Sequence, residues 1–260
     1  MGYYFNMEHA SYFILLFVVF SILGWCMEVS LKYIEFHRFI NRGFLIGPYC
    51  PIYGSGVLCI TLMNHIVGGP EVGIAETFIN GFIFCGILEY FVSWYLEKMY
   101  HARWWDYSHK PMNLNGRVWM GNLLLFGIGS LIIVKGINPL FFRFLDRMPK
   151  KILWIVAIVS ICIMAVDSVI SHFVMNSVKV VGEGSKEDNT EAISKEIRRL
   201  LRSKSFLHRR LVNAYPNMRA STNKIRKRMA QERKMIAERT KQERLRLYEE
   251  YQKIKEKVGR

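Results

Sequence analysis

Five long apolar stretches constrain this chain more than any other feature of its sequence. They lie at about 10–34, 49–69, 73–97, 117–136 and 152–177. A helix needs about 20 mostly apolar residues to cross the roughly 30 Å hydrocarbon core of a bilayer, and each stretch is about that long. The sequence therefore predicts an all-α, polytopic integral membrane helix bundle with about five transmembrane helices. No internal repeat is visible, so the pattern does not favour an inverted-repeat transporter.

The charge of the chain is concentrated in its last third. Residues 179–260 contain 24 Lys and Arg against 11 Asp and Glu, a net of +13 out of +15 for the whole chain. This change in composition divides the chain into a transmembrane helical domain at 1–178, a linker at 179–189 and a basic helical cytoplasmic tail at 190–260. The tail has few apolar residues, so we expect it to contribute little to the packing of the spans.

Within the tail, residues 190–213 and 221–258 are predicted to form helices separated by Pro216. The second helix is long, basic and mostly polar, and its end carries a short apolar seam of Leu247, Tyr251, Ile254 and Val258. This seam predicts a short coiled-coil contact at most, and the alternative is a solvated helix. Its net charge suits anionic lipid headgroups or an acidic partner. Nucleic acid is not an expected partner, because the sequence contains no recognised nucleic-acid motif.

The distribution of basic residues predicts the orientation in the membrane. Lys and Arg lie in the loops that follow the first and third spans and in the tail, and none lies between the second and third spans. Cytoplasmic loops carry the excess of these residues, so the pattern favours an N-terminus outside and a C-terminus inside the cell. The loop at 137–150 disagrees, because it carries Arg143, Arg147 and Lys150 on the outer side. The tail and the other loops outweigh it.

Three carboxylates interrupt the apolar stretches. Glu28, Glu89 and Asp167 lie in the later parts of the first, third and fifth spans, which run in the same direction. At 1.5 Å per residue all three reach the cytoplasmic half at similar depth. Ionisable groups in a span usually face the bundle interior, so the three acids predict one polar cavity on the cytoplasmic side. For any one of them alone, a structural hydrogen bond is the competing interpretation.

Two loops enter the same side. Residues 41–56 are interrupted by Gly47-Pro48 and Pro51, which suits irregular backbone lining a cavity. Residues 101–117 mix interfacial aromatic side chains with charged and amide groups, and the Arg side chains suit a carboxylate or phosphate. The candidate cavity residues are Glu28, Arg42, Tyr49, Tyr53, Glu89, Glu97, Arg103, Trp105, Asp106, Asn115, Arg117, Asn122 and Asp167. The sequence identifies no catalytic residue among them, and we expect no metal and no cofactor.

These residues also carry a family resemblance. Gly24-Trp25 with Glu28, the stretch 41–54, Leu88-Glu89-Tyr90, and Trp104 to Ser108 with Asn115-Gly-Arg117 are similar to the ABC-transporter permease family also called CmpB or ABC-transporter type IV. The resemblance spans roughly residues 10–178. It implies a multi-pass protein of the bacterial cytoplasmic (inner) membrane that acts as a permease.

Three classes of function remain open. The chain has no GxxxxGK[ST] motif, so a permease would need a separate ATPase subunit, and so few spans would favour a homo-oligomer. A membrane-embedded enzyme acting on lipid or cell-envelope intermediates would use the buried carboxylates with Arg42, Arg103 and Arg117 holding an anionic headgroup. A membrane scaffold would recruit a partner through its tail. A path open to both membrane faces would favour the permease, whereas a pocket that is closed on the outer side and opens laterally to lipid would favour the enzyme.

Overall fold

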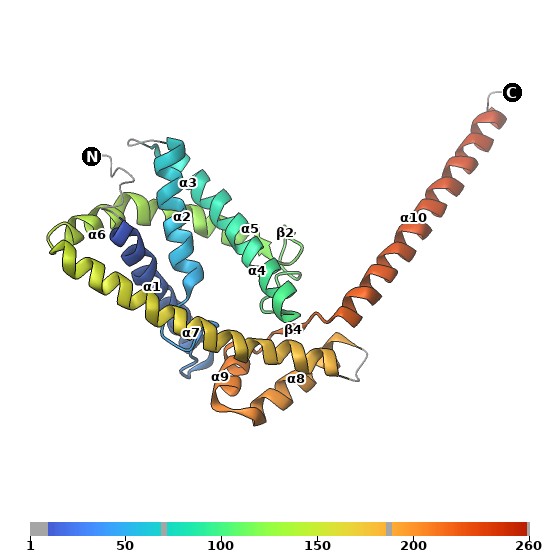
Figure 1. The fold of residues 1–260 in the computed structure, drawn as a ribbon. Coiled ribbons are helices and arrows are strands. Elements are labelled where there is room, and N and C mark those ends of the chain that lie inside the picture. Colours follow the sequence, from blue (N-terminus) through green and yellow to red (C-terminus); the bar gives the residue numbers. More distant parts are fainter. Residues whose placement is uncertain (1–9, 69–71, 186–188, 259–260) are drawn as a thin grey trace.

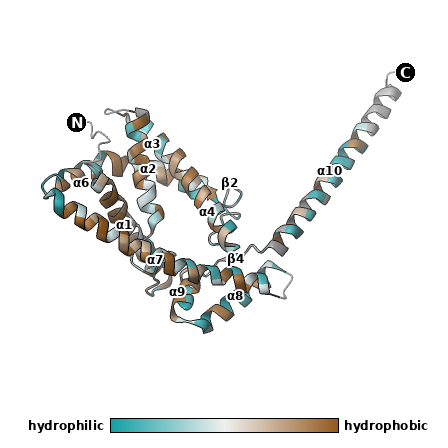
Figure 2. Cartoon of the chain, viewed as in Figure 1, coloured by the Kyte–Doolittle hydropathy of each residue, from teal (hydrophilic) through white to brown (hydrophobic). Residues whose placement is uncertain are grey.

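Four long apolar helices form the body of the protein. In the computed structural model, which describes residues 10–68, 72–185 and 189–258, these helices span Ala10–Phe36, Ile74–Tyr100, Met120–Leu145 and Lys150–Gly184. Each is long and apolar enough to cross a membrane. Figure 2 shows hydrophobic residues along them, whereas the last helix of the chain is mostly hydrophilic. The predicted helical, multi-pass membrane protein is therefore confirmed in its main features.

The second predicted span folds as a shorter helix. Residues 49–69 contain helix α2, Pro51–Gly68, which is not among the four long apolar helices. Its 18 residues make it shorter than the four long helices, and it carries the polar residues Tyr53, Asn64 and His65, of which Asn64 is buried. Helix α2 packs on α1 (Ala10–Phe36), and both lie inside the group of helices in Figure 1. The polar side chain of Asn64 is therefore sheltered by neighbouring helices.

Two of the long helices contain π-helical segments. The second long helix consists of α3 (Ile74–Asn80), the π segment η3 (Gly81–Cys85) and α4 (Gly86–Tyr100). The third consists of α5 (Met120–Leu131), η4 (Ile132–Ile137) and α6 (Asn138–Leu145). The predicted span at about 117–136 is therefore too short, because the helix continues through Asn138 and Pro139 to Leu145. Pro139 lies at the start of α6, directly after the π segment, where a missing N–H is tolerated.

The last long helix, α7 (Lys150–Gly184), is longer than a membrane is thick. Its 35 residues rise about 52 Å, against roughly 30 Å of hydrocarbon. The helix therefore continues well into the predicted linker at 179–189, of which residues 186–188 lie outside the described part of the chain. Its last turns support α8 (Thr190–Lys204) and α9 (Phe206–Ala214), which pack against α7 and each other.

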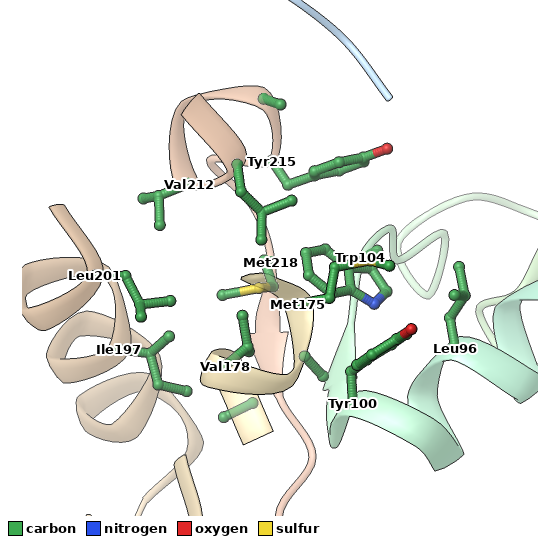
Figure 3. Close-up of a cluster of buried hydrophobic side chains, with 14 of the residues drawn as sticks. Leu96, Tyr100, Trp104, Met175, Val178, Ile197, Leu201, Val212, Tyr215 and Met218 are labelled. Atoms are coloured by element: carbon green, nitrogen blue, oxygen red, sulfur yellow. The ribbon is translucent and has the colours of Figure 1, made fainter. Parts of the chain in front are cut away.

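The tail is part of the folded body, contrary to our expectation that it adds little to the packing. The largest group of buried apolar side chains combines α4 and α7 with α8 and α9 (Figure 3). Ile197 and Leu201 of α8 are fully buried beside Val178 of α7, and Tyr215 packs on Trp104. The predicted helix 190–213 is broken at Ser205, which caps α9 by accepting a hydrogen bond from the His208 amide. This break lets both halves fold onto α7.

Short strands add a second connection between tail and body. Strand β1 (Ala102–Arg103) pairs with β4 (Arg219–Ala220), and β2 (Asn113–Leu114) pairs with β3 (Val118–Trp119) to form a hairpin. Neither pairing is predicted by the sequence. From β4 the chain enters α10 (Asn223–Val258), which projects away from the rest of the protein in Figure 1.

Candidate functional site

Two loops meet the ends of α1, α4 and α7 where α8 and α9 lie (Figure 1). We call this region the polar end. We call residues 37–50 the first loop and residues 101–119 the second loop. The three predicted carboxylates all bond to groups in these two loops: Glu28 to Arg42, Glu89 to Tyr107 and Asp167 to the Ile46 amide. Their similar depth is therefore matched by partners in the same region, although each acid has its own set of partners.

Asp167 anchors the first loop to α7. Its carboxylate accepts hydrogen bonds from the backbone amides of Ile46 at 2.9 Å and Gly47 at 2.7 Å. It also accepts from the Tyr49 hydroxyl at 2.6 Å and the Ser171 hydroxyl at 2.8 Å. The loop lacks regular structure, so its amides need such an acceptor when they leave water. For Asp167, these bonds support the competing interpretation, in which a single carboxylate makes structural hydrogen bonds.

Glu28 connects α1 to α2 and to the first loop. It accepts a hydrogen bond from the Tyr53 hydroxyl at 2.6 Å and lies 3.2 Å from the Arg42 Nε. The guanidinium of Arg42 also donates to the backbone carbonyl of Ala214 and lies over the ring of Tyr215, 4.8 Å from its centre. Arg42 is therefore shared between a membrane helix and the tail.

The Gly24-Trp25 pair beside Glu28 has a steric explanation. A Cβ on Gly24 would lie 2.3 Å from Cγ of Tyr53, so only glycine lets this ring lie against α1 and reach Glu28 one turn further on. The Trp25 indole donates to Asn41 at 2.7 Å, and Asn41 in turn donates to the Ile46 carbonyl at 3.1 Å. The motif therefore fixes both α2 and the first loop on α1.

We expect Gly24→Ala to destabilise the protein by about 1–3 kcal/mol, because the added methyl group overpacks the α1–α2 contact and displaces Tyr53. Thermal melting of the purified protein in detergent measures this. The matched control is Gly129→Ala, because a Cβ there meets nothing within 4 Å. Equal melting temperatures for the two variants would contradict the steric explanation.

Glu89 lies between the second loop and α5. One carboxylate oxygen lies 3.0 Å from the Asn122 amide nitrogen and 3.3 Å from the Tyr107 hydroxyl. The other oxygen, Oε2, is buried and has no hydrogen-bond partner among the described residues. Burial and the charge of Glu89 raise the pKa of Tyr107, so this hydroxyl stays protonated and able to donate. Glu89 is the predicted acid with unused hydrogen-bonding capacity.

A second group of charges lies nearer the tail. Glu97 binds Arg117 at 2.8 Å and Arg103 at 3.2 Å, and it accepts from the Ser221 hydroxyl at 2.7 Å. Asp106 pairs with Arg219 of β4 at 2.6 Å. Burial pushes the pKa of Asp106 up, but hydrogen bonds from Ser108 and Arg219 outweigh it and leave the pKa lowered. These pairs hold β4 against the second loop.

The other predicted residues of the second loop position its backbone. The Trp105 indole donates to the Arg117 carbonyl at 3.0 Å, and the Asn115 amide donates to the Tyr90 hydroxyl at 2.9 Å. The guanidinium of Arg117 lies 5.6 Å from the centre of the Tyr90 ring. The loop is therefore folded back along α4.

The predicted site residues fall into two groups. Glu28, Arg42 and Tyr53 form the first group, to which Asp167 and Tyr49 connect through the first loop. The second group follows α4 and the second loop, and contains Glu89, Glu97, Arg103, Trp105, Asp106, Asn115, Arg117 and Asn122. One cavity lined by all three acids remains a prediction. Two surface cavities, of about 370 and 580 Å³, are lined by other residues.

Sequence reasoning missed the contribution of the tail to this region. Arg210 donates to the Phe44 carbonyl at 3.0 Å, and Tyr215 stacks on the Phe44 ring at 4.7 Å. Cys50 is enclosed nearby, and burial together with the charge of Glu28 raises its pKa to about 12, so it remains a thiol. The available sequence signal was Tyr215-Pro216, which lies between Arg210 and Arg219.

Comparison with known families identifies the part of the chain that contains most of these residues. A family model described as "Putative ABC-transporter type IV" matches residues 15–172, which include most of α1, both loops and most of α7. The chain belongs to this family. No curated protein matches the chain, and no solved structure matches it. The match contains Glu28, Glu89 and Asp167 and ends before the tail that covers the polar end.

Proposed function

We propose that this chain is the membrane-spanning permease component of an ABC-type transporter in the bacterial cytoplasmic membrane, with its polar end on the cytoplasmic side. A separate ATPase subunit would supply the energy. The four apolar helices and the family match support this proposal, and α2 would complete a fifth crossing inside the bundle. Because so few helices enclose little space, the working unit would be a homo-oligomer.

The observation that carries the proposal is the position of Arg42. This side chain binds Glu28 in a membrane helix and the Ala214 carbonyl in the tail. An ATPase needs a cytoplasmic structure through which its movement reaches the membrane helices, and a tail bonded to charged groups of the bundle suits this role. Displacing residues 210–215 would remove the tail partners of Arg42 and so act on Glu28 through a single side chain.

Copurification tests the proposal. The full chain, carrying an affinity tag and expressed in its own host, should retain an ATP-hydrolysing subunit in mild detergent, and the complex should hydrolyse ATP. A variant with Arg42→Gln should retain the subunit while hydrolysis becomes uncoupled from transport. Isolation of an intact, folded chain without any ATPase, from several detergents, would contradict the permease assignment.

The proposed orientation has its own test. In a chain whose five cysteines are replaced, Arg147→Cys should react with an impermeant maleimide on intact cells, whereas Lys227→Cys should react only after lysis. Both positions are exposed, and they lie in the α6–α7 connection and in α10. Labelling of Lys227→Cys without lysis would reverse the orientation.

One observation favours the second candidate, a membrane-embedded enzyme. The free Oε2 of Glu89 is an unused acceptor beside the Tyr107 hydroxyl, as a general base would be. The two candidates differ in their response to Glu89→Gln. If the chain is an enzyme, Glu89→Gln should abolish a reaction that the isolated chain catalyses without an ATPase. If it is a permease, the substitution should reduce transport by the complex with its ATPase.

A further inference from the structure

An apolar groove lies on the outside of the bundle, next to the polar end. It has a volume of about 580 Å³, within the range of small-ligand sites. Its lining comes from η3 and α4, from Leu123 of α5, and from Leu114 and Val118 of the β2–β3 hairpin. The lining residues of η3 and α4 are Phe82, Ile83, Gly86, Ile87, Tyr90, Phe91 and Trp94. We call it the α4 groove.

The α4 groove is a built feature of the helix surface. Gly86 is buried, and a Cβ there would lie 2.4 Å from Leu123, so the absence of a side chain lets the two helices close beneath the groove. The hairpin forms the other wall, and the bond from Asn115 to the Tyr90 hydroxyl holds it over α4. Leu114 is nevertheless 58% exposed on the hairpin. The apolar side chain of Leu114 is therefore exposed next to the membrane helix that contains α4.

The dimensions fit one leaflet of a bilayer. From Phe82 to Trp94 the helix rises about 18 Å, close to half of the roughly 30 Å hydrocarbon thickness. Both η3 and α4 belong to a long apolar helix able to span a membrane. Trp94 and Trp119 are aromatic residues of the type enriched at membrane interfaces. A groove of this length, with Trp94 at the interface, would reach to about the middle of the bilayer.

Exposed cations lie at the interfacial end of the groove. The Lys98 ammonium lies 4.6 Å from the centre of the Trp94 ring, and the Lys110 ammonium lies 5.3 Å from that of Trp119. Trp94 lines the groove, and Trp119 adjoins Val118 in its hairpin wall. Within the part of the chain that the structure describes, neither lysine forms an ion pair. The positive charges suit the anionic headgroup of a phospholipid, and the apolar groove suits its acyl chain.

We propose that the α4 groove binds one acyl chain of an anionic phospholipid, whose headgroup is held between Lys98 and Lys110. This site is separate from the polar cavity of the proposed permease and does not depend on transport. A lipid bound here would rest on both the hairpin and α4, and so would hold the second loop in place against Glu89 and Glu97.

The test is native mass spectrometry of the purified full chain, delipidated and then given equal amounts of phosphatidylglycerol and phosphatidylcholine. At about 1 kcal/mol for each basic residue near a lipid surface, two lysines predict roughly a tenfold or greater preference for phosphatidylglycerol in the first bound lipid. Lys98→Gln with Lys110→Gln should abolish it. The control is Arg143→Gln with Arg147→Gln, which removes two exposed cations near α6 and should preserve the preference.

The hairpin provides a matched pair that locates the site. Leu114→Glu places a carboxylate in the groove wall and should abolish the preference, whereas Met112→Glu alters an exposed residue outside the lining and should keep it. A phosphatidylglycerol with a photoreactive acyl chain should crosslink to residues 82–94. Equal binding of both lipids, or equal effects of the two hairpin variants, would overturn the proposal. The proposal would also be overturned if the Ile87→Cys variant formed a disulfide between two copies of the chain and this dimer bound no lipid, because a second copy would then occupy the groove.

Discussion

Removing residues 190–260 should unfold the membrane body or greatly weaken it, whereas ending the chain after Lys227 should leave the body folded. The first truncation deletes α8, α9, β4 and the residues that connect and follow them, and residues 190–260 together supply more than half of the largest group of buried apolar residues. The second removes most of α10, which projects from the body and exposes apolar side chains such as Ile236. Detergent melting curves of the three chain lengths give the comparison.

A single pair of substitutions separates packing from chain length. Ile197 is fully buried, so Ile197→Ala should cost about 2–5 kcal/mol through lost apolar contact and the cavity left behind. Leu200 lies on the same helix and is 46% exposed, so Leu200→Ala should change stability by about 0.5 kcal/mol or less. If the chain without residues 190–260 and the Ile197→Ala variant both melted like the full chain, the tail would not contribute to the stability of the membrane body.

The sequence signal for this packing was present but was masked by the charge of the tail. Ile193, Ile197 and Leu201 recur every four residues, which places them on one face of α8. The many Lys and Arg residues on the opposite face dominated the composition of the whole segment. A count over 82 residues could not separate the amphipathic α8 and α9 from the polar α10.

The spans themselves were predictable because a bilayer demands long apolar helices, and four of the five predicted stretches meet that demand. The exception, α2, is sheltered by its neighbours, and burial in protein tolerates Tyr53 and Asn64 where lipid would not. For the site, the sequence predicts which polar residues lie at similar depth in the membrane but not which of them contact one another. Which acid meets which group depends on how two irregular loops fold, and two-residue strands such as β1 and β4 carry no periodicity.

Depth alone is not enough to assign a role to Asp167. We grouped it with the functional carboxylates, yet both of its oxygens are occupied by donors from the first loop and Ser171. Glu89, at similar depth, keeps one oxygen without a partner among the described residues. Hydrogen-bond satisfaction therefore distinguishes an acid that holds structure from one that is able to take a ligand or a proton.

Asp167→Ala should accordingly be among the most destabilising single substitutions in the chain. It leaves the Ile46 amide, the Gly47 amide and the Tyr49 hydroxyl without their acceptor. Each buried donor left unsatisfied costs about 1–3 kcal/mol, so the total loss should exceed about 3 kcal/mol. Tyr49→Phe removes a single donor and should cost roughly 1 kcal/mol. Melting in detergent, and the rate of proteolysis within residues 37–50, report the two effects.

Ser168→Ala is the matched control, because the Ser168 hydroxyl donates to the Met164 carbonyl of its own helix at 2.7 Å and to no other described residue. This variant should melt within about 2 °C of the unaltered chain, as expected for a change of stability below about 0.5 kcal/mol. Asp167→Asn keeps one acceptor oxygen but turns an NH₂ group toward a donor, so it should fall between Tyr49→Phe and Asp167→Ala. A stable Asp167→Ala variant with a protected loop would mean that the first loop is held by its contacts with Arg42, Phe44 and Tyr215 instead. In that case Asp167 would return to the set of acids available for function.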